Sequence, residues 1–119
     1  MTDQDPNETL SAAAEQLRAF NHASIRPSDD WTFPGHSYSA LGTLTHLAQM
    51  LEQAIEQATR PAMRTYEHGR LLIDGQGDAD VAVAEMLADK DDAVQCAQEL
   101  ASLLGKLHAT TSAMALDTD

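Results

Sequence analysis

The segment ALGTLTHLAQMLEQAIEQATRPA (residues 40–62) decides the fold. Its apolar residues recur at alternating intervals of three and four, which is the spacing of the seams along which helices pack in bundles. The seam consists of Leu41, Leu44, Ala48, Leu51, Ile55, Ala58 and Ala62. Pro61 lacks a backbone N–H and its ring crowds the preceding turn, so it must interrupt the helix. We therefore predict a long helix over residues 38–73, capped by Ser37 or Ser39 and broken near Pro61.

A second and a third helical pattern flank this segment. Residues 8–21 carry one apolar stripe and follow Asn7, a suitable N-cap; the stripe is Leu10, Ala13, Ala14, Leu17 and Phe20. Residues 79–115 carry another stripe, which Asp78 or Asp80 can cap; it comprises Val83, Leu87, Val94, Ala97, Ala101 and Leu104, flanked by Leu100, Leu103 and Leu107. The glycine-rich turn near residue 76 makes the long helix and the last helix an antiparallel hairpin.

The composition agrees with an all-α fold. The chain has 119 residues, of which 43% are hydrophobic and only 4% aromatic, and its apolar residues are mainly Ala and Leu, which favour helices. We predict a single three-helix domain over residues 7–115, with disordered tails at 1–6 and 116–119. The first helix is too short to cover the hairpin, so we expect two copies to associate into a four-helix bundle. In the alternative, the loop bearing Trp31 and Phe33 folds back and closes the gap.

The net charge of −12 limits the classes of partner. Phosphate backbones and anionic lipid surfaces repel such a chain, so we expect no direct nucleic-acid binding and no membrane binding. The acidity can serve solubility or attract a basic protein partner. The single Cys96 excludes an internal disulfide and, with an acidic and polar start unlike a signal peptide, predicts a cytoplasmic protein.

The segment DGQGDADVAVAE (residues 74–85) resembles an EF-hand calcium loop in the spacing of its oxygen-bearing side chains. However, the position that requires a glycine is Ala79, and Ala82 and Gln76 stand where stronger ligands are usual. Gly75 and Gly77 also suit a simple chain reversal ahead of a helix. We favour that interpretation and predict no metal and no cofactor.

No catalytic constellation is visible. The five histidines do not form pairs four residues apart on one helix face; they are His22, His36, His46, His68 and His108. Cys96 and His108 would lie about 18 Å apart along one helix, too far for a nucleophile–base pair. No phosphate-binding glycine loop or nucleophile elbow occurs. We therefore predict that the chain is not an enzyme.

The loop NHASIRPSDDWTFPGH (residues 21–36) and its exit hold three of the five aromatic residues, and aromatic residues often anchor interfaces. The candidate partner-binding residues are Asn21, His22, Trp31, Phe33, His36 and Tyr38. In a competing interpretation, Trp31 and Phe33 plug one end of the bundle.

Three short segments carry a family resemblance: FNHAS (20–24), TFPGHSY (32–38) and GRLLIDGQGDADVAVAE (69–85). They resemble small, uncharacterised actinobacterial all-helical proteins. The resemblance implies a helical fold and no particular activity.

Together, these features predict a non-enzymatic acidic helical protein-interaction module, an adaptor or an inhibitor of a basic partner. The alternative is a binder of a small ligand or of a metal ion, calcium or zinc. It would use the Asp-rich turn 74–85 or the His-bearing loop 21–38.

Overall fold

The computed structural model describes residues 4–118 and is all-helical. Its helices are α1 (Pro6–Ala23), α2 (Pro34–Ala58), α3 (Arg60–Glu67) and α4 (Ala79–Thr111). The predicted all-α fold with three helical segments is confirmed, with the middle one divided into α2 and α3. Of the predicted tails, residues 1–3 and 119 lie outside the described residues, and Pro6 already belongs to α1.

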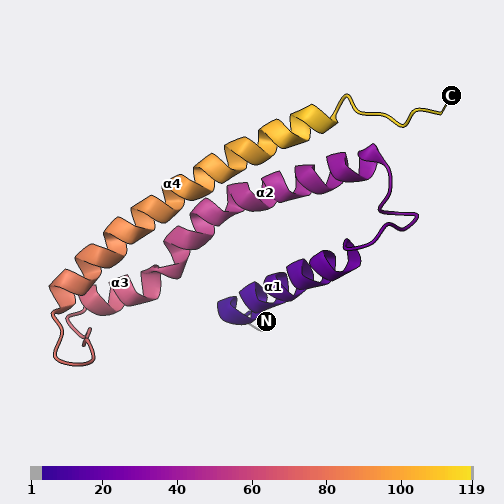
Figure 1. Cartoon of the computed structure of the whole chain (residues 1–119). Helices are drawn as coiled ribbons and strands as arrows, with labels where there is room; N and C mark the ends of the chain where they lie inside the picture. The colour runs from indigo at the N-terminus through magenta and orange to yellow at the C-terminus, as the bar shows by residue number, and fades with distance from the viewer. Residues whose placement is uncertain (1–3, 119) are drawn as a thin grey trace.

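The core of the fold is the long hairpin of α2 and α4 (Figure 1). The two helices run antiparallel, and Gln98 Nε2 of α4 donates a hydrogen bond of 2.9 Å to Glu52 Oε1 of α2. The most buried hydrophobic residues are Ala48, Val83 and Ala97. Two of these are alanines, which allow the helix backbones to approach closely but bury little apolar area.

The break predicted near Pro61 is present at Thr59, between α2 and α3. Pro61 has no N–H to offer the carbonyl of Gln57, so the ladder of hydrogen bonds stops there. It restarts where the Met63 N–H donates to the Thr59 carbonyl over 3.1 Å, and the Thr59 hydroxyl donates to the Glu56 carbonyl. The long helix therefore bends while α3 still lies against α4.

The predicted end of the long helix at residue 73 is wrong, because α3 stops at Glu67. Gly69 adopts a left-handed conformation with φ of 69°. The Gly69 N–H donates to the Tyr66 carbonyl and the Arg70 N–H to the Thr65 carbonyl, which satisfies the last carbonyls of the helix. A glycine in this position ends a helix even where the apolar pattern could continue.

The other helix ends also differ in detail from the prediction. Asp5 rather than Asn7 caps α1, since its carboxylate accepts the Asn7 N–H over 2.9 Å. Helix α2 begins at Pro34, a residue suited to the first helical turn, so Ser37 and Ser39 lie inside the helix. Asp78 caps α4 as predicted, and α4 ends at Thr111 rather than at residue 115.

The molecule is elongated. It measures 70 × 32 × 30 Å and has a radius of gyration of 19.9 Å, whereas a compact domain of this length has about 14 Å. The accessible surface is 9580 Å², against about 6,300 Å² for a compact monomer of this mass. The single chain therefore leaves an unusually large surface in contact with water.

Candidate functional site

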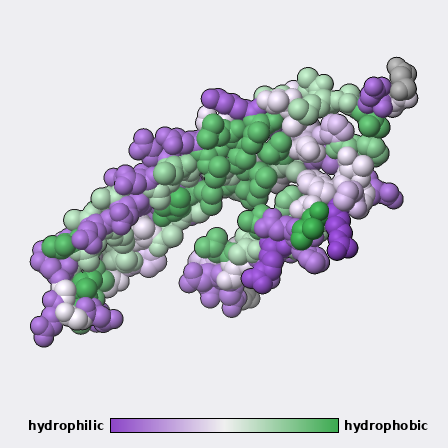
Figure 2. All heavy atoms as spheres, in the orientation of Figure 1, coloured by the Kyte–Doolittle hydropathy of each residue, from purple (hydrophilic) through white to green (hydrophobic). Residues whose placement is uncertain are grey.

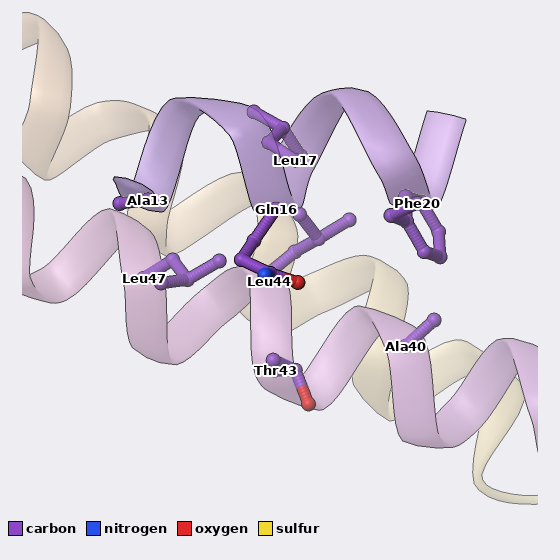
Figure 3. Close-up of a pocket in the computed structure, with 8 residues that line it drawn as sticks. All are labelled: Ala13, Gln16, Leu17, Phe20, Ala40, Thr43, Leu44 and Leu47. Carbon is purple, nitrogen blue, oxygen red and sulfur yellow. The ribbon is translucent and has the colours of Figure 1, made fainter. Parts of the chain in front are cut away.

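An apolar slot separates α1 from α2 (Figure 3). Four residues of each helix line this cavity of about 340 Å³: Ala13, Gln16, Leu17 and Phe20 from α1, and Ala40, Thr43, Leu44 and Leu47 from α2. Gln16 and Thr43 supply the only polar side chains of the lining. The slot therefore suits an apolar group better than a charged one.

Helix α1 faces α2 without packing directly on it. No Cα atom of α1 comes within 8 Å of a Cα atom of another helix. Helices in direct contact have axes only about 8–10 Å apart. At that separation, many Cα atoms of one helix lie within about 8 Å of Cα atoms of the other. The apolar stripe predicted on α1 is therefore only partly covered, and Leu10 and Leu17 are exposed.

A second apolar strip is exposed on α4. Cys96, Leu100, Leu103 and Leu107 recur at intervals of four, three and four residues, and we call these four residues the α4 seam. The exposed fractions of its leucines are 45%, 57% and 53%. This spacing is that of a helix-pairing seam, yet no other helix within residues 4–118 covers it.

The α4 seam lies on the same side of the hairpin as the slot. At about 100° per residue, the slot-lining residues of α2 lie to one side of the buried Ala48, and Glu52 lies to the other side. Likewise, the α4 seam lies to one side of Ala97 and Gln98 to the other. Because Glu52 and Gln98 are hydrogen-bonded to each other, the two apolar strips share the opposite side.

We call this side the apolar face. It consists of the α4 seam together with Ala40, Leu44, Leu47 and Leu51 of α2. Figure 2 shows hydrophobic residues gathered over the middle of the hairpin. No Asp, Glu, Lys or Arg occurs in residues 34–51, and residues 93–111 contain only Glu99 and Lys106. In a chain with 22% charged residues, this half of the hairpin is thus almost free of charge.

The predicted binding loop is held down by its own contacts. The Trp31 ring meets Phe20 of α1 edge to face, with centroids 5.5 Å apart, and its Nε1 donates to the Ser24 carbonyl over 3.0 Å. Asn21 and His22 lie exposed in the last turn of α1. Trp31 therefore fixes the path of the chain from α1 to α2.

Phe33, His36 and Tyr38 lie at the start of α2. Phe33 is exposed, and His36 Nδ1 accepts the N–H groups of Thr32 and Phe33 over 3.0 and 3.1 Å, so this nitrogen caps the helix. His36 also lines a shallow depression together with Trp31. Tyr38 points elsewhere, toward α4. Of the six candidate residues, the structure thus brings His36 together with Trp31 and with Phe33, whose ring centroid lies 5.6 Å from that of His36; their role in partner binding stays a prediction.

A ring contact at the open end of the hairpin was missed by the sequence analysis. Tyr38 stacks on His108 of α4, with centroids 4.2 Å apart. A Cβ atom on Gly42 would lie 3.0 Å from His108 Nε2, so the glycine makes room for the imidazole. A glycine within the apolar pattern of residues 40–62 was the available signal for this close approach.

The Asp-rich turn has the form of a chain reversal. Gly75 and Gln76 take positive φ angles of 76° and 64°, and the Asp78 carboxylate is used to cap α4. Ala79 is the first residue of that helix, where an EF-hand loop would need its left-handed glycine. Across residues 4–118, no three His, Cys, Asp or Glu side chains lie close enough together to hold a metal ion.

Near the turn, Tyr66 of α3 donates a hydrogen bond from its hydroxyl to Asp80 of α4. This hydrogen bond, with the negative charge of the same carboxylate, raises the pKa of Tyr66. Partial burial and the charge of Asp78 act in the same direction. The contact ties α3 to the first turn of α4.

No protein-family model, no curated protein and no solved structure matches this chain. The resemblance to small actinobacterial helical proteins therefore stays a prediction. Within the described part of the chain, no helix has both the length and the apolar character needed to cross a membrane.

Proposed function

We propose that the chain is a non-enzymatic helical protein-interaction module, an adaptor or an inhibitor, and that the apolar face is its binding surface. The observation that supports this most directly is the set of half-exposed leucines on the half of the hairpin that is almost free of charge. Monomers rarely leave a large apolar patch in water, and such patches usually mark interaction sites.

The shape of the surface favours a helical ligand. The slot lies between the apolar side of α1 and that of α2. A groove of this kind receives the apolar side of an amphipathic helix. Leucines spaced three and four residues apart on α2 would fit a partner helix with the same spacing.

The charge distribution favours a basic partner. Residues 52–92 hold ten acidic and four basic residues, a net charge of −6, at the turn end of the hairpin next to the apolar face. A partner with an apolar helix and basic flanks would satisfy both regions, since opposite charges across an interface speed association and aid specificity. The homodimer predicted from the sequence belongs to the same proposal, because a second copy can cover part of the same face.

Capture from a lysate of the native host, with chemical cross-linking and mass spectrometry, tests this function. Leu47 lines the slot and is 42% exposed, so Leu47→Glu should disrupt binding while preserving the hairpin. Leu72 is 91% exposed in the turn region and lies off the apolar face, so Leu72→Glu is the matched control.

We expect one basic protein to be captured in stoichiometric amount by the wild type and by Leu72→Glu, but not by Leu47→Glu. Capture of the same proteins by all three chains, or of none by the wild type, would contradict the proposed function.

A further inference from the structure

One position on the apolar face is empty. Helix α1 lies over α2, since the slot between them is lined by residues of these two helices alone. No helix occupies the corresponding position over α4, and Leu100, Leu103 and Leu107 are about half exposed there. The chain thus presents two apolar strips, and α1 faces only the one on α2.

We propose that a second copy of this chain fills the empty position, with its own α4 seam packed against the first. This inference rests on the proposed function, in that it names one occupant of the apolar face. The slot between α1 and α2 stays open for another protein.

The surplus surface of the whole chain, of which the α4 seam is one part, exceeds what such a dimer buries. The chain exposes about 3,300 Å² more than a compact monomer of its mass. A stable, specific dimer buries about 600–1,000 Å² on each partner. If α1 packed directly on α2, the α4 seam would still be exposed, because the apolar stripe of α1 faces α2 and not the α4 seam.

The composition of the seam suits self-association. All four of its residues are uncharged, so two copies can meet there without burying a charge. The net charge of −12 opposes the approach of two copies at low salt, and added salt screens this repulsion. The dimer should therefore tighten as the salt concentration rises.

The place of α1 determines how the two copies are oriented. If the second α4 ran antiparallel to the first, the α2 helix of the second copy would fall where α1 lies. A two-fold axis parallel to α4 avoids this collision, because it places the second α2 on the other side of the pair. In this parallel arrangement each seam residue meets its own counterpart, and Cys96 lies beside Cys96 of the second copy.

The mass of the purified chain gives the first test. We expect sedimentation of the wild type to give about twice 12.8 kDa, and Leu103→Glu to give 12.8 kDa with an unchanged far-UV helix signal. Leu72→Glu, the control off the apolar face, should remain dimeric. A wild type that stays at 12.8 kDa at high salt, or a Leu103→Glu variant that stays dimeric, overturns the proposal.

The single cysteine gives the second test, for the orientation. Copper phenanthroline in air should convert most of the wild-type chain to a disulfide-linked dimer on a non-reducing gel. The control moves the thiol to the solvent side of the same helix in the double variant Cys96→Ser with Ala88→Cys, which should cross-link at least tenfold more slowly. Equal rates for the two chains, or a dimer that does not cross-link at Cys96, contradict the parallel pairing.

The two proposals fail separately. A chain that is monomeric alone but still captures a partner through Leu47 refutes the pairing of the α4 seams and leaves the proposed function intact. A dimer that captures no partner supports the pairing and refutes the adaptor or inhibitor function.

Discussion

The two halves of the hairpin share α2 and α4 but differ in charge and in the exposure of their apolar residues. The turn half, residues 52–92, carries a net charge of −6 and ends in the capped turn and the contact between Tyr66 and Asp80. The open half, residues 34–51 and 93–111, has almost no charge and exposes leucines on one side. From this difference we propose that a partner covers the open half and not the turn half.

The largest effect should come from the buried residues through which α2 packs on α4. Ala97 is only 6% exposed, and Ala97→Asp would bury a carboxylate with no partner, at a cost of about 3 kcal/mol or more. We expect urea denaturation to show loss of the cooperative transition. Ala88→Asp places the same charge on the exposed side of α4 and should cost only about 1 kcal/mol, mainly through the lower helix propensity of Asp. Equal effects would mean that α4 does not pack on α2 through Ala97.

A smaller effect should separate two glycines of the open half. Gly42→Ala places a methyl group against the imidazole of His108, which Tyr38 holds from another side, and overpacking of this kind costs about 1–3 kcal/mol. The better helix propensity of alanine offsets about 1 kcal/mol of this. We expect a net loss of about 1 kcal/mol in thermal or urea denaturation.

Gly105→Ala provides the comparison for that variant. Gly105 has no atoms near the position of an added Cβ, so here the propensity gain of about 0.5–1 kcal/mol should appear as added stability. If both alanines stabilise the protein equally, the contact between Gly42 and His108 does not form in solution.

The smallest effect should be at the turn half and should depend on pH. The raised pKa of Tyr66 means that the folded state favours the protonated phenol beside Asp80. This contribution is therefore fully present below the ordinary pKa of tyrosine and is lost as the pH rises through the raised value. In an absorbance titration, we expect the tyrosine that ionises at unusually high pH to disappear in Tyr66→Phe and to remain in Tyr38→Phe. The opposite result would place the perturbed tyrosine in the open half.

The sequence predicted what depends on local pattern. The alternating spacing around Ala48 and the missing N–H of Pro61 are local facts, and both the hairpin and its break follow from them. Gly69 lies within the segment that was predicted to be helical as far as residue 73. The left-handed conformation of that glycine is what ends α3.

The candidate site depends on contacts between distant residues, and these were harder to predict. The α4 seam was recognised only as a flank of the core, because its direction depends on where α2 and α1 lie. The stacking of Tyr38 on His108 joins residues far apart in the sequence and has no local signal other than Gly42. Trp31 was predicted either to bind a partner or to plug the bundle; its contact with Phe20 joins the loop to α1, and both interpretations stay predictions.

The most direct test of this account is the sedimentation of the wild-type chain over a range of concentrations, at low salt and at about 0.5 M salt. Because the open half carries almost no charge and exposes leucines, we expect a monomer–dimer equilibrium that reaches about twice 12.8 kDa and tightens with salt. A single species of 12.8 kDa at every concentration and at both salt levels would contradict the claim that a second copy covers the apolar face.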